Sequence, residues 1–243
     1  MTIFQRVTRP LNQLIMAGMI CCYGSAQAGQ SELHNQNNPE QSRYALGGYQ
    51  LEFAWNGSTF KIDSDPDGVD GKFGGAHFVI NGLVYAGGTL TPQNCEASPG
   101  CGWMMEDGQL VAEFPEQVVG RITSSGWFLP QPHIEAMLSA MSRGDGAGFI
   151  EAYMAELGKV TAKVNHIIEL ADGFQISENM LTLDGMTGTI LPGEHLSIAV
   201  TGGTGKFKWA PREAQVTMLS LFNGSGANSF GIELLPAFGR VSF

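Results

Sequence analysis

Short segments in which apolar and polar residues alternate run along most of the chain, and glycine, proline or asparagine separates them. A period of two is typical of a strand that buries one face. We predict strands in these segments: Tyr49–Trp55, Thr59–Ile62, Ala76–Ala86, Gln117–Leu129, Val160–Leu170, Leu196–Val200, Val216–Phe222 and Phe230–Leu235. This many short strands predicts an all-β protein.

Residues 131–159 interrupt the pattern, because apolar residues recur there at helical spacing. We predict two helices in this stretch, one around Met137 and one around Tyr153, with Gly144-Asp-Gly146 between them. Such a helical hairpin, inserted between strands, could cap the end of a barrel as a lid or form a contact between subunits.

Three glycines, Gly202, Gly203 and Gly205, lie within the segment Val200-Thr-Gly-Gly-Thr-Gly-Lys-Phe207. Glycine permits a positive φ and a close backbone approach, which a strongly coiled sheet or small barrel needs where a strand bends. A phosphate-binding loop would need serine or threonine directly after the lysine, but Phe207 follows Lys206. We therefore interpret the segment as a structural corner.

The same segment resembles the allene oxide cyclase barrel-like and dirigent proteins, which carry Gly-Gly-Thr-Gly-x-aromatic-x-x-Ala at a comparable corner. The matching residues, which are structural, are Gly202, Gly203, Thr204, Gly205, Phe207 and Ala210. The resemblance extends loosely over Tyr44–Phe243. It implies an eight-stranded antiparallel barrel with an apolar interior, often trimeric. A mature chain of this length can form one domain, so we expect a single β-barrel domain over 44–243 with the helical insertion 131–159. Members of the superfamily cyclise an unstable fatty-acid epoxide or steer radical coupling without redox chemistry of their own.

The first 28 residues have the features of a signal peptide: Arg6 and Arg9, a short apolar run, and the small-x-small site Ala26-Gln-Ala28. The polar residues 29–43 are predicted to be a disordered leader. We therefore expect an exported protein, periplasmic or secreted, of the bacterial type. Cleavage removes two arginines and no acid, so the formal net charge changes from −10 to −12. That charge argues against nucleic acid or an anionic membrane surface as a partner, and no stretch is long enough to span a membrane.

Cys95 and Cys101 are the cysteines that remain after cleavage, and in an exported protein they are expected to form a disulfide. The segment Asp63-Ser-Asp-Pro-Asp-Gly68 matches the start of a calcium-binding loop, but Gly74 stands where the closing glutamate is needed. An acidic surface turn is the alternative. We predict no metal site and no cofactor, because the chain has neither a metal-ligand cluster nor a dinucleotide fingerprint.

Three residues are candidates for a site inside the barrel. Arg121 and Trp127 share one face of the predicted strand Gln117–Leu129; inward they could bind a ligand, and outward Arg121 would be solvated. His166 lies on the apolar face of Val160–Leu170, as a core residue or as a polar group of a cavity. Arg121 and His166 are also the candidates for catalysis.

Two functions follow from this pattern. In the first, the barrel binds a small apolar molecule in its interior and steers its reactions without bond chemistry of its own. In the second, it is a cyclase or isomerase acting on an oxidised lipid or related small molecule, with Arg121 and His166 stabilising developing charge. Two polar groups that converge on one cavity would favour the enzyme, and a wholly apolar interior would favour binding.

Overall fold

A computed structural model describes residues 50–63, 75–91, 95, 100–143, 145–155, 157–172 and 175–235. The predicted signal peptide 1–28, the leader 29–43 and most of the acidic segment that begins at Asp63 lie outside the described residues.

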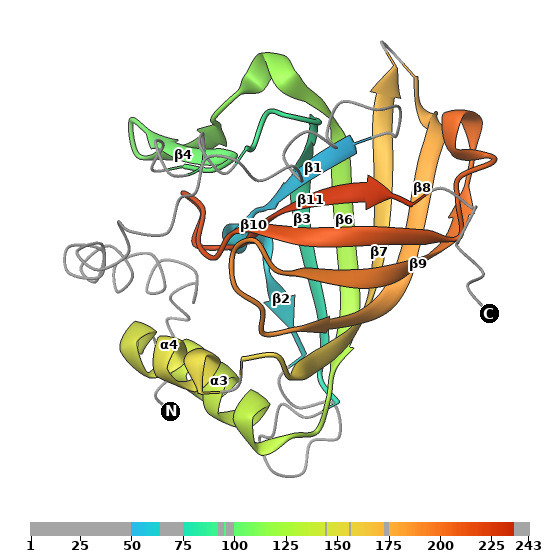
Figure 1. Ribbon diagram of the computed structural model, residues 1–243. Helices are drawn as coiled ribbons and strands as arrows, with labels where there is room; N and C mark the ends of the chain where they lie inside the picture. The colour runs from blue at the N-terminus through green and yellow to red at the C-terminus, as the bar shows by residue number, and fades with distance from the viewer. Residues whose placement is uncertain are drawn as a thin grey trace, which may run out of the picture.

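Eight antiparallel strands form a closed barrel in the order β1-β11-β10-β9-β8-β7-β6-β3, and β3 pairs with β1 to close it (Figure 1). The strands of the barrel are β1 (Gln50–Trp55), β3 (His77–Ala86), β6 (Val118–Phe128), β7 (Val160–Asp172), β8 (Gln175–Gly188), β9 (His195–Gly203), β10 (Glu213–Ser220) and β11 (Ser229–Leu234). The predicted all-β fold and the strand number implied by the resemblance are confirmed.

The remaining elements lie outside the closed ring of strands. They are η3 (Gly57–Thr59), β2 (Lys61–Ile62), β4 (Trp103–Glu106), β5 (Gln109–Ala112), η4 (Pro115–Gln117), α3 (Pro132–Ser142), α4 (Gly146–Met154) and η5 (Gly205–Phe207). Strand β2 extends the sheet beside β3, and β4 and β5 form a separate hairpin. Helices α3 and α4 connect β6 to β7 and pack against one end of the barrel, so the predicted helical hairpin is confirmed (Figure 1).

Apolar side chains fill the barrel. On β1 the alternation places Leu51 and Phe53 inside, and on β7 it does the same for Val164 and Ile168, all at most 5% exposed. The Phe53 ring stacks on that of Phe230 with centroids 5.0 Å apart. Removing this apolar surface from water is the main term that favours folding.

A second apolar cluster covers the outer face of β1 and β3. It contains Ala54, Tyr85, Leu90 and Cys101, and the predicted disulfide between Cys95 and Cys101 is present beside it. The buried Glu52 carboxylate accepts hydrogen bonds from the backbone N–H groups of the neighbouring segment, at Gly88 and Leu90. Burial raises the pKa of Glu52, and those N–H donors oppose the rise.

The glycine segment forms a tight corner at the end of β9, in which η5 turns the chain toward β10. Gly205 has a φ of +53°, a left-handed conformation that favours glycine. Phe207 is 1% exposed and anchors the corner in the core. Thr204 joins the corner to β8: its backbone N–H donates to the Met180 carbonyl at 2.8 Å, and its hydroxyl accepts from the Met180 N–H at 3.0 Å.

Gly203→Ala is expected to lower the free energy of unfolding by about 1–3 kcal/mol, because overpacking strains a closed core. A Cβ at Gly203 would lie 2.2 Å from the Phe207 carbonyl oxygen, which belongs to the anchored backbone. Gly202→Ala is the matched control, since its Cβ would meet only the Thr182 hydroxyl, at 2.8 Å. Chemical denaturation of both variants measures the difference, and equal losses would contradict this account of the corner.

Candidate functional site

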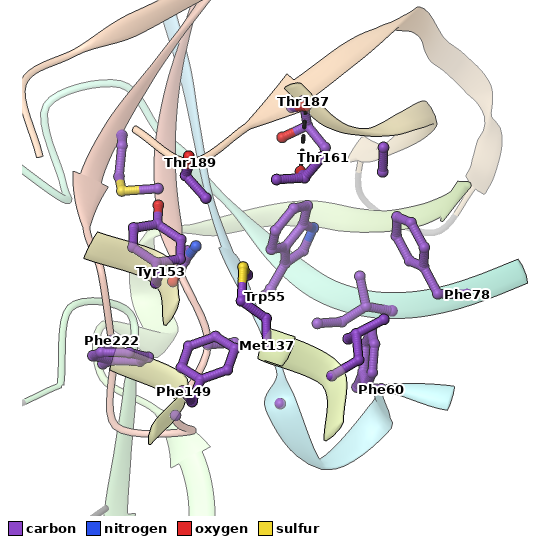
Figure 2. A pocket seen from close by; sticks show the side chains of 18 of the residues that line it. Trp55, Phe60, Phe78, Met137, Phe149, Tyr153, Thr161, Thr187, Thr189 and Phe222 are labelled. Carbon is purple, nitrogen blue, oxygen red and sulfur yellow. Dashed lines mark hydrogen bonds between the residues drawn. The ribbon is translucent and has the colours of Figure 1, made fainter. Parts of the chain in front are cut away.

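A cavity of about 210 Å³ lies between the end of the barrel and the α3–α4 hairpin (Figure 2). The barrel contributes inward-facing residues near the strand ends, among them Trp55, Phe78 and Phe230. The hairpin contributes the apolar stripes of both helices, which include Met137 on α3 and Phe149 on α4. Eight aromatic side chains take part in the lining: Trp55, Phe60, Phe78, Phe128, Phe149, Tyr153, Phe222 and Phe230.

Tyr153 fastens the hairpin to the barrel. Its hydroxyl donates to the Ile190 carbonyl at 2.7 Å and accepts from the Ile190 N–H at 3.1 Å. Both residues are buried, and burial raises the pKa of Tyr153 to about 12. The neighbouring Phe149 ring approaches Phe222 with centroids 6.2 Å apart, so a second contact holds the same helix. The hairpin therefore covers one end of the barrel.

A hydrogen-bonded chain of three side chains supports the barrel side of the cavity. The Trp55 indole N–H donates to the Ser124 hydroxyl at 2.9 Å, and that hydroxyl lies 2.7 Å from His166 Nδ1. The Ser124 hydroxyl accepts from the indole, which can only donate, and we assign its own proton to the bond with Nδ1, which makes Nε2 the protonated nitrogen of a neutral ring. Burial lowers the pKa of His166 to about 4, so the ring is neutral at pH 7. The chain fixes the plane of Trp55, the member of the three that lines the cavity.

Other polar atoms of the lining also bond to the protein. The Thr161 hydroxyl donates to the Thr187 carbonyl at 3.3 Å (Figure 2). The Ser225 hydroxyl lies 2.9 Å from the Trp55 carbonyl. None of the described residues that line the cavity is Asp, Glu, His, Lys or Arg. The surface offered to a ligand is therefore mainly apolar and uncharged.

Arg121 and Trp127 do not lie inside the barrel. The Arg121 guanidinium is on the outer face, 3.7 Å from the Glu169 carboxylate, with 61% of its side chain exposed. Trp127 is 52% exposed and packs against His77 on the outside, with ring centroids 5.0 Å apart. The alternation of β6 turns Ser124 and its even-numbered neighbours inward. Of the two alternatives for Arg121 and Trp127, the structure therefore has the outward one, in which Arg121 is solvated.

The two candidates for catalysis are on opposite sides of the barrel wall. His166 is inside and 4% exposed, whereas Arg121 faces solvent. His166 lies beside Trp55, with ring centroids 6.1 Å apart, and is not part of the cavity lining. The structure therefore does not bring Arg121 and His166 together on one ligand.

Sequence reasoning missed the aromatic side chains that form the cavity. Phe149 and Tyr153 belong to the helical stripe that predicts the hairpin, and Trp55 ends a predicted strand. The sequence signal that could have found them is this apolar stripe, because an amphipathic helix buries its apolar face against another apolar surface. Nothing in the pattern indicates that a space remains between the hairpin and the barrel end.

Within the described part of the chain, no group of three or more His, Cys, Asp or Glu residues is arranged to hold a metal ion. No helix among the described residues has the length and apolar character required to cross a membrane.

No protein-family model matches the chain, and no curated protein matches it. Similar solved structures include a pyocyanin demethylase, which is 11% identical with a TM-score of 0.39 and covers 78% of this chain and 100% of its own. Two pterocarpan synthase dirigent proteins are 13% and 14% identical, each with a TM-score of 0.41. Each of these covers 77% of this chain, with 85% and 92% of their own chains matched.

Proposed function

We propose that this protein binds a small, neutral, apolar molecule in the cavity between the barrel end and the α3–α4 hairpin, and performs no bond chemistry of its own. The observation that carries the proposal is the lining itself, which is largely aromatic and apolar, with no charged residue among its described members. Concave apolar sites with few polar groups are the usual form of small-molecule sites.

The size of the cavity limits the ligand. A protein cavity of about 150 Å³ lined by apolar side chains binds benzene. At 210 Å³ the cavity here accommodates a molecule of roughly two fused rings. A flat aromatic molecule suits the walls best, because aromatic pairs gain energy beyond the area that they bury.

The charge of the site also limits the ligand. A carboxylate or ammonium in this cavity would lose its water without gaining an ionic partner among the described lining residues, and that desolvation is costly. Tyr153 is the titratable lining residue in the described part of the chain; its pKa is raised to about 12 and its hydroxyl is engaged by Ile190. Among the described lining residues, no carboxyl, imidazole or amine is present to act as a general acid or base near pH 7, and this favours binding over the cyclase or isomerase.

We also propose that the protein is exported. The Cys95–Cys101 disulfide supports this, since disulfides persist in oxidising compartments. The oligomeric state implied by the resemblance, a trimer, stays a prediction.

Isothermal titration of the purified protein with naphthalene and with 2-naphthoate tests the proposal. The two probes share one ring system, and the second carries a carboxylate. We expect naphthalene to bind with a dissociation constant on the order of 1–100 µM. The affinity for 2-naphthoate is expected to be lower by more than about tenfold, because of the cost of desolvating its charge.

Two variants locate the binding. Met137→Trp fills the cavity from α3 and should weaken naphthalene binding at least about tenfold. Met154→Trp places the same ring on the hairpin at a position that is 46% exposed and outside the lining, so binding should be unchanged. Equal binding by the two probes, or by the two variants, would rule out the cavity as the site.

A further inference from the structure

Trp209 is the most exposed large hydrophobic residue among those described, at 87%. It follows η5 at the glycine corner. The connection between β9 and β10, which contains this corner, lies on the side of the barrel far from the α3–α4 hairpin (Figure 1). A single exposed apolar residue is common on protein surfaces and needs no explanation by itself. The rigidity and charge of its surroundings distinguish Trp209.

The backbone on which Trp209 sits is held from both sides. The Phe207 N–H donates to the Thr204 carbonyl and the Ala210 N–H donates to the Phe207 carbonyl, both at 2.9 Å. The Phe207 side chain is buried in the core at 1% exposure. The indole is therefore displayed on a fixed corner, which reduces the entropy that binding would cost.

Basic residues are concentrated in the sequence around this corner. From His195 to Arg212 the chain contains Lys206, Lys208 and Arg212 and no Asp or Glu, although the formal net charge of the whole chain is −10. Lys208 and Arg212 are exposed, and the Lys208 ammonium lies 5.5 Å from the centroid of the Trp209 ring. Glu213 is the next acid along the chain.

We propose that this corner, residues 206–212, docks on the surface of a bilayer that contains anionic lipid. The indole has an apolar body and a polar N–H, which suits the head-group region where tryptophan is enriched in membrane proteins. Lys208 and Arg212 extend their charged ends to lipid phosphates while their stems cover apolar surface.

The net negative charge of the chain does not prevent this docking. Exposed charges more than about 8–10 Å apart are largely screened at physiological ionic strength. The local charge of the corner therefore decides the interaction, and each cation near an anionic surface strengthens binding about fivefold. An acidic protein surface would also complement the cations. It would not explain why an exposed indole lies between them, whereas a bilayer interface would.

Sedimentation of the full chain with phosphatidylcholine vesicles, with and without phosphatidylglycerol, tests the proposal. The protein should sediment with the vesicles that contain phosphatidylglycerol, and less so at high salt. Trp209→Ala should weaken this binding about tenfold or more, and Lys208→Gln about fivefold. Trp127→Ala is the matched control, because that tryptophan is also exposed but lies on the outer wall of β6; its binding should equal that of the wild type.

The proposal is overturned if the wild type sediments with neither kind of vesicle, or if Trp209→Ala binds the vesicles as tightly as the wild type does. Capture of an acidic protein by the corner without vesicle binding would overturn it as well. Naphthalene affinity should be the same in Trp209→Ala and the wild type, because no residue of the corner is in the described cavity lining. A negative result for vesicle binding therefore leaves the proposed ligand site untouched, and a negative result for naphthalene binding leaves the membrane proposal untouched.

Discussion

Between pH 7 and pH 4, the free energy of unfolding is expected to fall by about 3 kcal/mol through His166 alone. Burial lowers the pKa of this ring to about 4, from an ordinary value near 6.5. In that window the unfolded chain binds a proton and the folded chain does not, so stability falls as the pH falls. Above pH 7 the ring is neutral in both states and contributes no further pH dependence.

Two carboxyl groups, one buried and one partly buried, change stability in the opposite direction. Burial raises the pKa of Glu52 and of Glu113, so the folded state binds their protons more readily and gains stability as the pH falls. The pH dependence of the free energy of unfolding therefore combines the effects of several groups. The contribution of His166 is obtained by comparing the wild type with a variant that lacks this ring.

His166→Asn removes the titration and keeps an oxygen that can accept from the Ser124 hydroxyl. Urea unfolding at a series of pH values should show a shallower decline for this variant than for the wild type, whatever its stability at pH 7. Ile168→Val is the control, because it alters the same buried face of β7 without removing a titratable group, so the decline should stay unchanged. Parallel curves for His166→Asn and the wild type would contradict the assignment of a neutral buried ring.

The alternation of residues predicts where most strands lie but not which face of β6 points inward. Three inward positions of this strand, Gly120, Ser124 and Gly126, carry small residues because neighbouring groups fill the space beside them. A Cβ at Gly126 would lie 2.2 Å from the Lys163 carbonyl oxygen and 2.9 Å from the Phe78 ring. The Ser124 hydroxyl contacts both Trp55 and His166. The alternate residues that include Arg121 and Trp127 therefore have the larger side chains, although they face solvent. The sequence pattern alone does not reveal this orientation.

On β7 the same reasoning succeeds, because its inward face carries the larger apolar side chains. Val164, Ile168 and Leu170 are all buried, with His166 among them. Strand β8 and the β4–β5 hairpin had no counterpart among the predicted strands. The cavity could not be predicted at all, since it depends on how far α3 and α4 stand from the barrel end. That distance is set by tertiary contacts such as the one between Tyr153 and Ile190.

Tyr153→Phe is expected to lower the free energy of unfolding by about 2–4 kcal/mol, because it leaves the N–H and the carbonyl of buried Ile190 without this partner. The loss should be concentrated in the hairpin, where amide hydrogen exchange over residues 146–154 should accelerate. Since the hairpin forms one wall of the cavity, naphthalene affinity should fall at least about tenfold with it.

Tyr85→Phe separates the function of the hairpin from general stability. Tyr85 is fully buried in the outer cluster, and its hydroxyl donates to the Gly102 carbonyl. Its loss should lower the free energy of unfolding by about 1–3 kcal/mol. Tyr85 is not in the cavity lining, so naphthalene affinity should stay at the wild-type value. If both tyrosine variants weakened naphthalene binding equally, affinity would follow global stability, and the hairpin would have no specific part in holding the ligand.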